Sequence, residues 1–361
     1  MNYNTNEKCL IYLSCFQFLT YEKLDKLIYL CETPEKLIHK LIDKKYEILK
    51  ILSLEEYERI LKYLDDDVLK AYLKKLEDAN IKCVTYYSDN YPEKLKHIDK
   101  PPYILYCKGD LSLLNSPSIA IVGSRKPTSY GEIITKQFTE GLVDNGLTIV
   151  SGLAYGVDKI ANEVAVSRGK TIAVLGGGFN QIYPKINTDL ASKIAEKGLL
   201  VSEYHIDTKP QSYHFISRNR IIAGLCDAVL ITEAAEKSGS MHTKEFALDV
   251  GKDVFAVPGN INSENSKGTN KLIKCTQAHI ATTYTDILDR LNIKPKQIKT
   301  VVDKKTDNEQ LIVNALKNGE RHFEELLLIT KLDTKTLNTC LTTLTIRGII
   351  KKLTGNYYII L

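Results

Sequence analysis

From residue 118 onward, short apolar runs of strand length alternate with segments long enough for one helix each. The runs are rich in Ile, Val, Leu and Ala and show little polar alternation, which predicts strands buried on both faces. Such strand–helix alternation is typical of a parallel, doubly wound sheet. The sequence therefore predicts an α/β, extended Rossmann-like domain over residues 81–291, with strands at 81–87, 118–123, 147–152, 171–176, 199–204, 228–234, 253–259 and 278–281.

Two smaller modules are predicted on either side of this domain. Apolar residues at helical spacing over residues 1–80 predict an N-terminal helical, SAM-like module. Residues 292–308 are polar and charged, and we interpret them as a linker. Residues 309–361 combine three short helical patterns with a final hairpin, which predicts a winged-helix-like domain with its recognition helix at residues 334–347. That domain could bind DNA or dock a protein, and both readings stay open.

Composition sets broad limits on the function. The net charge is +5, and residues 291–361 carry 12 Lys and Arg against 7 Asp and Glu, a local excess that could meet phosphate. No apolar run has the length of a membrane span and the first residues do not form a secretory signal, so we expect a cytoplasmic protein. The eight cysteines lack paired spacing, which predicts reduced thiols and no metal site.

The turn that follows the run at 118–123 has the residues of an anion site. It reads Gly123-Ser124-Arg125, and hydroxyl residues capable of capping the next helix come directly after it. A helix N-terminus with free N–H groups attracts phosphate, and an arginine adds a two-pronged contact. The turn after 147–152 begins with Ser151-Gly152 and is interpreted in the same way.

Two more segments at the expected carboxyl edge of the sheet have suitable side chains. Phe215 could stack a base while Arg218, Asn219 and Arg220 hold its phosphates. In the alternative, structural interpretation, Phe215 packs in the core and the two arginines pair with Glu203 and Glu233. The turn after 228–234 supplies a lysine, two hydroxyls and a glycine ahead of a helix: Lys237, Ser238, Gly239 and Ser240.

Signatures of common nucleotide enzymes are missing from the sequence. It has no GxxxxGK[ST] loop and no G-x-S-x-G elbow, and Gln181 stands where a third glycine of G-x-G-x-x-G would be. No cofactor and no catalytic residue is therefore predicted. Two alternatives to DNA binding by the sheet domain remain: a hydrolase of nucleotide glycosidic bonds that uses Glu203, Glu233 or Asp158, and a DNA-binding regulator that acts through the C-terminal domain.

Taken together, the blocks IAIVGSRKPTSYG, SGLAYGVD, TIAVLGGG, FISRNRIIAGL, EAAEKSGSMHT and FAVPGNI resemble the DNA-processing protein A family (DprA, also called Smf). The resemblance covers about residues 90–290. It implies a non-catalytic homodimer that binds single-stranded DNA and loads a RecA-type recombinase during natural transformation. It also implies a DNA pocket formed by Arg125, Phe215, Arg218, Arg220, Lys237, Ser238 and Gly239. The chain departs from the family pattern at Gln277-Ala278 and at Phe179-Asn180.

Overall fold

The computed structural model describes residues 3–41, 43–63, 66–296 and 306–360. Contacts divide the chain into two compact units, Met1–Pro295 and Lys296–Leu361. The division falls inside the segment 292–308 that we interpreted as a linker, of which residues 297–305 lie outside the described residues.

Helices open the first unit. They are α1 (Thr5–Leu13), α2 (Tyr21–Cys31), α3 (Pro34–Lys40), α4 (Lys45–Ile48), α5 (Leu54–Lys62) and α6 (Asp66–Asp78). They have an apolar core of their own, which includes Leu27, Leu37 and Ile60. A second core joins α1 and α6 to the first strands of the sheet and includes Leu76 and Tyr106. The predicted helical module thus packs on one edge of the sheet and belongs to the same compact unit.

The described part of the first unit contains a nine-stranded sheet in the order β1-β2-β6-β5-β4-β3-β7-β8-β9. The neighbours from β6 through to β9 are parallel. The strands are β1 (Lys82–Thr85), β2 (Ile104–Gly109), β3 (Ser118–Val122), β4 (Thr148–Ser151), β5 (Thr171–Val174), β6 (Leu199–Ser202), β7 (Ala228–Ile231), β8 (Asp253–Ala256) and β9 (His279–Ile280).

Strand β2 was not predicted. It follows Pro101-Pro102, and only the four-residue helix α7 (Glu93–Lys96) separates it from β1, so it lies outside the alternation of strands and longer helices that identified the other strands. It pairs antiparallel with β1 on one side and with β6 on the other, where Cys107 is opposite Val201. The predicted α/β class is confirmed, and the predicted parallel sheet gains an antiparallel edge of two strands.

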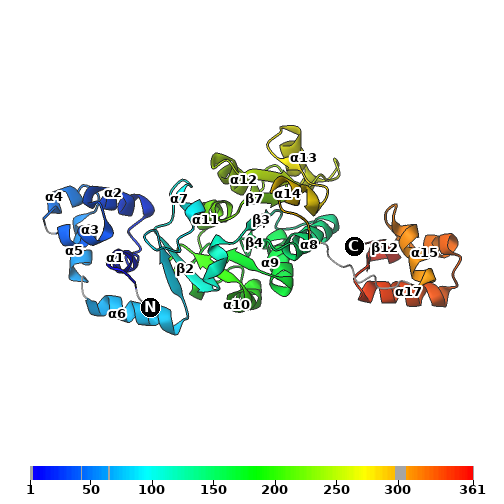
Figure 1. Cartoon of the computed structure of the whole chain (residues 1–361), viewed down its shortest axis with the longest axis horizontal. Coiled ribbons are helices and arrows are strands. Elements are labelled where there is room, and N and C mark those ends of the chain that lie inside the picture. The colour runs from blue at the N-terminus through cyan, green and yellow to red at the C-terminus, as the bar shows by residue number, and fades with distance from the viewer. Residues whose placement is uncertain (1–2, 42, 64–65, 297–305, 361) are drawn as a thin grey trace. The chain divides into compact units, whose positions relative to one another are not determined.

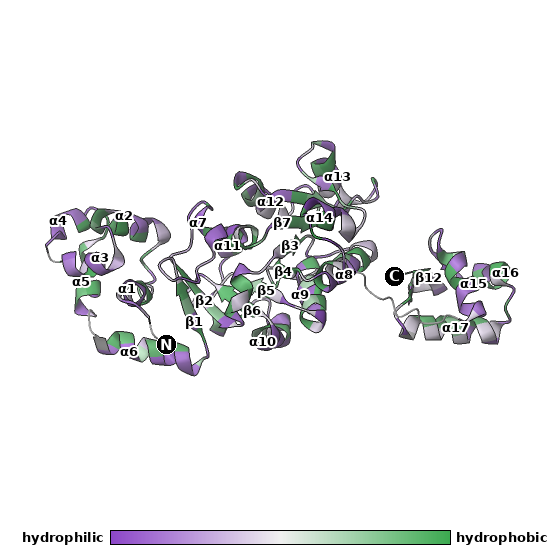
Figure 2. Ribbon diagram, viewed as in Figure 1, coloured by the Kyte–Doolittle hydropathy of each residue, from purple (hydrophilic) through white to green (hydrophobic). Residues whose placement is uncertain are grey.

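Helices cover both faces of the sheet, as the alternation predicted (Figure 1). Ile119 and Ile121 of β3 pack on the face of α8, α9 and α14, whereas Ala120 and Val122 pack on the face of α11, α12 and α13. Helices around the sheet have one hydrophobic and one hydrophilic side (Figure 2). The helices are α7 (Glu93–Lys96), α8 (Ser129–Asp144), α9 (Val157–Arg168), α10 (Thr188–Lys197), α11 (Ser212–Leu225), α12 (Ser240–Asp249), α13 (Glu264–Lys274) and α14 (Tyr284–Arg290).

The order of the strands locates the place where a ligand can bind. The chain winds outward from β3 through β4, β5 and β6, and then returns to β7 on the other side of β3. The connections that follow β3 and β7 therefore diverge to opposite sides. In open parallel sheets, such a reversal leaves a crevice beyond the carboxyl ends of the two strands. The predicted site residues of 123–125 and 237–240 follow these two strands.

The second unit contains the predicted helices and final hairpin. Its elements are α15 (Asp307–Leu316), β10 (Arg321–His322), α16 (Phe323–Thr330), α17 (Thr334–Ile346), β11 (Ile350–Lys352) and β12 (Tyr357–Ile360). The strands form an antiparallel sheet in the order β10-β12-β11. The short strand β10 was not predicted, because two residues give no periodic pattern.

Helix α17, predicted as a recognition helix, has a largely neutral surface. Arg347 at its end lies 3.3 Å from the carboxylate of Glu309, which is itself buried. The hydroxyls of Thr339 and Thr343 donate to backbone carbonyls one turn earlier in the helix, at 2.9 Å each. These groups are thus engaged within the domain.

Candidate functional site

The turns that follow β3, β4 and β7 are tied to one another by backbone hydrogen bonds. The N–H of Ser124 donates to the carbonyl of Glu233 over 2.7 Å, and the N–H of Val157 donates to the carbonyl of Ser124 over 3.1 Å. A side chain at Gly123 would overlap this same Glu233 carbonyl. The carboxyl edge of the sheet is therefore one continuous surface, as the sequence analysis expected.

The N-terminus of α8 already has an anion from within the chain. Thr128 caps the helix by accepting from the N–H of Gly131 at 3.2 Å. The carboxylate of Glu233 accepts from the N–H of Thr128 at 2.8 Å and from its hydroxyl at 2.7 Å. Glu233 is only 1% exposed. Our expectation that this helix start binds phosphate is thus corrected, because a buried carboxylate takes that position.

The turn after β4 is held from below by side chains. The hydroxyl of Ser151 donates to the carbonyl of Ile121 at 2.7 Å, and the N–H of Gly152 donates to the Asp158 carboxylate at 3.1 Å. Asn162 and Asn187 form hydrogen bonds with the backbone of Leu153, the residue after Gly152, whose φ angle is in the left-handed region. Ser151 and Gly152 are buried. They were predicted as DNA contacts, and that stays a prediction; in this structure their polar groups form hydrogen bonds within the chain.

Asn162 and Asn187 were not identified from the sequence. Both are fully buried. Asn187 lies in the run YPKIN, and its amide donates to two successive carbonyls of the β4 turn at 2.9 and 3.2 Å. The asparagine that ends this run was the available signal, but one sequence does not reveal which backbone it contacts.

Arg218 lies beneath the β4 turn rather than on the surface. Its guanidinium donates to the carbonyl of Gly152 at 2.7 Å and to the carbonyl of Val174, and the residue is 3% exposed. Its Nε has no hydrogen-bond partner within the part of the chain that the structure describes. Burial lowers the pKa of Arg218 to about 10 and raises the pKa of nearby Asp158. The contact between Arg218 and DNA stays a prediction, and in this structure the Arg218 guanidinium supports the β4 turn.

Arg220 is also engaged inside the molecule. It forms a two-pronged ion pair with Glu203 at 2.6 and 2.7 Å, and its side chain is 7% exposed. The alternative interpretation, in which an arginine of this segment pairs with Glu203, is the one observed. Glu233 bonds Thr128 and not an arginine. The phosphate contact predicted for Arg220 likewise stays a prediction, and in this structure its guanidinium is engaged by Glu203.

Cations at the edge itself are exposed. Arg125 and Lys237 are both exposed, and neither has an ion-pair partner among the described residues. The amide of Asn219 donates to the carbonyl of Gly239 at 3.3 Å and so joins α11 to the turn after β7. The first turn of α12 has no side-chain cap, although the hydroxyls of Ser238 and Ser240 lie 2.9 Å apart beside it.

Aromatic side chains lie on the segments that follow β4 and β5 and at the start of α11. Phe215 is half-buried, and its ring centroid is 5.4 Å from that of Tyr183. Tyr183 is 50% exposed and Tyr155 is 44% exposed. A side chain on Gly176 would overlap the ring of Phe215, so the turn after β5 lies directly against it. Tyr183 was not named from the sequence, although it belongs to the same YPKIN run as Asn187.

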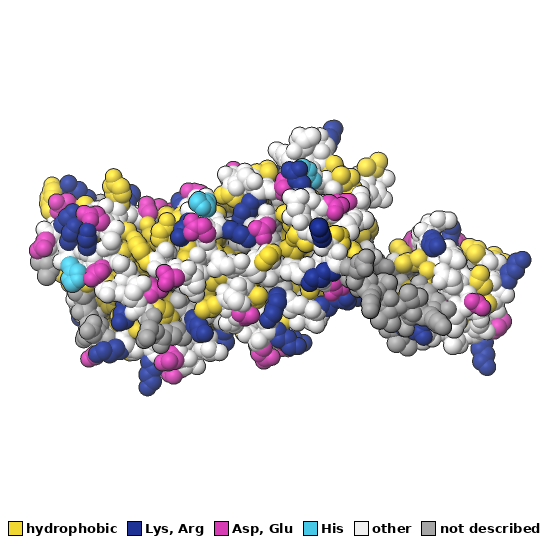
Figure 3. Space-filling model, in the orientation of Figure 1, with side chains coloured by type: hydrophobic (Ala, Val, Ile, Leu, Met, Phe, Trp, Pro, Cys, Tyr) yellow, Lys and Arg dark blue, Asp and Glu magenta, His cyan; other side chains and the backbone are white. Residues whose placement is uncertain are grey.

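The described residues contain neither a metal-binding cluster nor a membrane-spanning helix. No group of three or more His, Cys, Asp or Glu side chains there could hold a metal ion. None of the helices in that part of the chain is long and apolar enough to cross a membrane. On the face shown in Figure 3, Lys and Arg are interspersed with Asp and Glu.

Several known proteins are similar to this chain in sequence. The DNA processing protein DprA of Bacillus subtilis is 42% identical over 209 residues, which are 57% of this chain and 69% of that protein. Protein Smf of Escherichia coli is 40% identical over 242 residues, 66% of this chain and 64% of that protein. The Streptococcus pneumoniae DprA is 41% identical over 226 residues, 62% of this chain and 78% of that protein.

Solved structures of DprA proteins also match this chain. The X-ray structure of DprA from Streptococcus pneumoniae matches with a TM-score of 0.68 and 35% identity, covering 80% of this chain and 98% of that one. A Helicobacter pylori DprA structure, which concerns the single-stranded DNA binding mode of that protein, matches with a TM-score of 0.54 and 36% identity. It covers 59% of this chain and 95% of that one. The model of the DNA recombination-mediator protein A family matches residues 82–292, and this chain belongs to that family.

Proposed function

We propose that this chain binds single-stranded DNA, without catalysis, along the carboxyl edge of its sheet. The contacts we assign to the strand are exposed or partly exposed: the Gly123-Ser124-Arg125 turn, the Lys237-Ser238-Gly239 turn with Asn219, and the Phe215 ring. Ser151, Gly152, Arg218, Arg220 and Ser240 are assigned to support them. DNA-processing relatives and the Helicobacter pylori protein, which binds single-stranded DNA, support this proposal.

The proposal rests on one observation: the acidic side chains named here are buried or nearly so, whereas Arg125 and Lys237 are exposed. Asp158, Glu203 and Glu233 are buried or nearly so and are bonded within the chain. Arg125 and Lys237 are exposed and lack an ion pair within the described ranges. Free cations beside neutralised acids give a positive local potential, which attracts a phosphate chain without reading its sequence.

The aromatic side chains give the strand's bases a place to stack. Phe215 and Tyr183 form a partly exposed pair, and Tyr155 presents another ring from the β4 turn. Stacking of a base on an aromatic side chain is worth roughly 1–3 kcal/mol and tolerates any base. A duplex keeps its bases inside the helix, so this edge should prefer single strands.

The further steps of the proposal rest on family membership. The family is one of DNA recombination mediators. We propose that the chain acts as a homodimer in the cytoplasm, holds incoming single strands and loads a RecA-type recombinase onto them, as in natural transformation. These steps involve surfaces for which we assign no residues.

The two alternatives drawn from the sequence have less support. A hydrolase would need a free carboxylate, yet Glu203 is paired with Arg220 and Glu233 is bonded to Thr128. A regulator that acts through α17 would need several free cations on that helix, but Arg347 is paired with Glu309, and Lys335 is the one other cation that the described helix carries. We therefore assign DNA binding to the sheet domain.

Fluorescence anisotropy with labelled oligonucleotides tests this function. We expect the chain to bind a single-stranded oligo-dT more tightly than a duplex of the same length. Arg125→Ala should weaken oligo-dT binding about tenfold or more, because a hydrogen bond to a charged group contributes about 1.5–3 kcal/mol. Arg168→Ala is the matched control, since Arg168 is exposed on α9 but paired with Asp144 at 2.7 Å. Equal losses in the two variants, or a preference for duplex, would contradict the proposal.

A further inference from the structure

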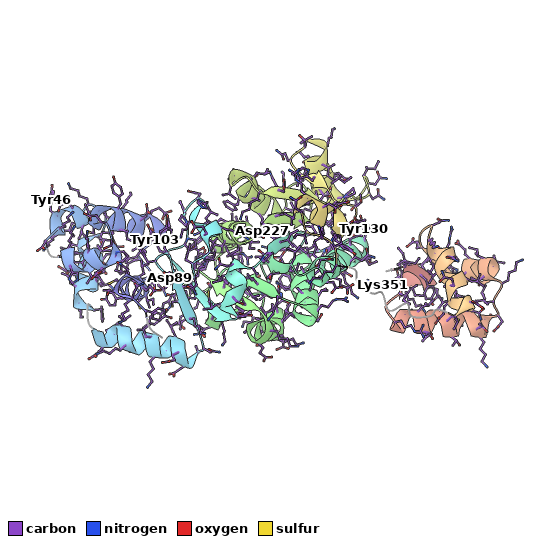
Figure 4. All side chains as sticks on the ribbon, viewed as in Figure 1. Tyr46, Asp89, Tyr103, Tyr130, Asp227 and Lys351 are labelled. Atoms are coloured by element: carbon purple, nitrogen blue, oxygen red, sulfur yellow. The ribbon has the colours of Figure 1, made fainter. Side chains whose placement is uncertain are left out.

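Beyond the exposed cations, the crevice at the carboxyl edge contains a cavity of about 570 Å³. It lies between the turns that follow β3, β7 and β8. Its walls include Thr128 and Tyr130 at the start of α8, the Glu233 carboxylate, and Pro258, Asn260 and Ser266 from the connection that leads into α13. Tyr130 is labelled in Figure 4. The volume is within the usual range for sites that bind small molecules.

One wall of this cavity has a hydroxyl that nothing in the fold uses. Ser266 is 2% exposed, yet its side-chain oxygen makes no hydrogen bond to any described residue. The cavity leaves this hydroxyl accessible, so it is available to bond a molecule that enters. By contrast, the hydroxyl of Tyr130 is engaged, since it donates to the Pro258 carbonyl at 2.8 Å.

The charge of the cavity restricts what can enter. Glu233 supplies a buried carboxylate, and each of its oxygens accepts only one hydrogen bond within the described chain. A carboxylate oxygen can accept more than one, so acceptor capacity remains. A phosphate group would be repelled here. A neutral group that donates hydrogen bonds, such as an amino group, would be attracted.

The cavity adjoins the turn that carries Arg125. The amide of Asn265 at the start of α13 donates to the carbonyl of Lys126 at 2.9 Å. This bond ties the β3 turn to the segment whose Ser263 and Ser266 line the cavity. Tyr130 is 44% exposed and adds an aromatic side to the wall. A strand whose phosphate lies at Arg125 could therefore place a neighbouring base in this space.

We propose that the cavity takes a nucleobase with an exocyclic amino group, which Glu233 accepts while Ser266 bonds another edge atom of the base. The inference rests on the proposed binding of single-stranded DNA, and it adds a preference to an otherwise sequence-tolerant edge. Thymine has no amino group and so forms the poorest contact. Cytosine is the best comparison because it is a pyrimidine of similar size, with an amino group at N4.

The test compares oligo-dC and oligo-dT of equal length at pH 8 by fluorescence anisotropy. We expect the wild-type chain to bind oligo-dC about tenfold more tightly, the effect of one hydrogen bond to a charged group. Ser263→Leu fills the cavity, and Ser263 makes no side-chain cap bond at α13, so the helix should be kept. This variant should bind both oligonucleotides as the wild type binds oligo-dT. Asn262→Leu, at an exposed neighbour outside the cavity wall, is the control and should keep the preference.

The outcomes separate this inference from the proposed function. Equal binding of the two oligonucleotides by the wild type, or a preference that survives Ser263→Leu, would overturn the inference and leave single-strand binding intact. Failure to bind either one would overturn the proposed function as well. Deoxycytidine alone provides a further arm. If it raises the melting temperature while the two oligonucleotides bind alike, the cavity belongs to a free nucleoside and the assignment to a strand is wrong.

Discussion

The turn after β4 and the turn after β7 look alike in sequence but differ in how their polar groups are used. Both combine small residues with hydroxyls, and both lead into a helix. In the β4 turn, Asp158 and Arg218 bond the backbone from inside the protein. In the β7 turn, Lys237 is exposed and the first turn of α12 has no side-chain cap. The first turn is a rigid support, and the second is available to a ligand.

This difference shows that a small-residue turn at the carboxyl edge is not by itself a binding site. A turn of this kind can bind a ligand only if no internal carboxylate or guanidinium already forms hydrogen bonds with its polar groups. The β3 turn combines both cases, because its helix start is satisfied by Glu233 whereas Arg125 remains exposed. Variants of the two kinds of turn should therefore affect different measurements.

The largest effect is expected at the rigid turn. Arg218→Ala leaves the buried carbonyls of Gly152 and Val174 without their donor, at about 1–3 kcal/mol for each unsatisfied group. It also leaves the buried Asp158 without its nearby cation. The free energy of unfolding should fall by that order. Urea unfolding followed by circular dichroism measures it, since the chain has no Trp. Arg168→Ala, with an exposed pair, should cost less than about 1 kcal/mol. Equal midpoints for the two variants would contradict a supporting role for Arg218.

A smaller loss is expected from a methyl group added at the start of α8. Gly131→Ala would overlap the Glu233 carboxylate, so we expect a loss of about 1–3 kcal/mol. Gly239→Ala is the matched variant at the β7 turn, because the structure has nothing within 4 Å of the added carbon. Its midpoint should stay within about 0.5 kcal/mol of the wild type. Thermal unfolding of the two variants measures the difference. If Gly131→Ala is as stable as the wild type, the Glu233 carboxylate can move away from the start of α8, which would contradict the account.

At the available turn, the effect should appear in binding and not in stability. Lys237→Ala removes one phosphate contact, so oligo-dT binding should weaken about fivefold, or about 1 kcal/mol, with an unchanged melting temperature. Lys271→Ala serves as the comparison, because Lys271 is paired with Glu236 at 3.2 Å. Anisotropy titration measures both. If the two lysines prove equivalent, exposure without a partner is not what marks the site.

The smallest effect concerns acid pH. Burial lowers the pKa of His205 and of His214 in the folded chain, so both prefer the neutral form there. The unfolded chain binds protons more readily, and stability should therefore fall as pH drops below about 6.5. The His214 ring accepts from the N–H of Gln211 at the start of α11, a bond lost on protonation. Melting curves from pH 7.5 to 5 test this, and His214→Asn should flatten the slope.

Much of the fold follows from local pattern. Continuous apolar runs predicted the strands from β3 to β9, because burial on both faces requires apolar residues at every position. The pattern missed β2 and β10, which are a strand outside the alternation and a strand of two residues. The positions of the turns 123–125, 151–152 and 237–240 at one edge also followed, since parallel strands end together.

The orientation of the polar side chains could not be predicted. Arg218 and Asn219 are neighbours in sequence, yet Arg218 is buried whereas Asn219 reaches the β7 turn. Helical rotation separates them, and only the packed α11 shows which one faces inward. In the same way, Glu233 and Thr128 lie far apart in sequence and meet only in the folded sheet.

Salt dependence tests the central claim most directly, namely that exposed cations at the carboxyl edge bind a phosphate chain. For the wild type, the logarithm of the oligo-dT association constant should fall linearly with the logarithm of salt concentration, at about −0.7 per phosphate neutralised. The Arg125→Ala, Lys237→Ala double variant should show a slope shallower by about 1.4. A flat response for the wild type, or the same slope for both proteins, would contradict the claim.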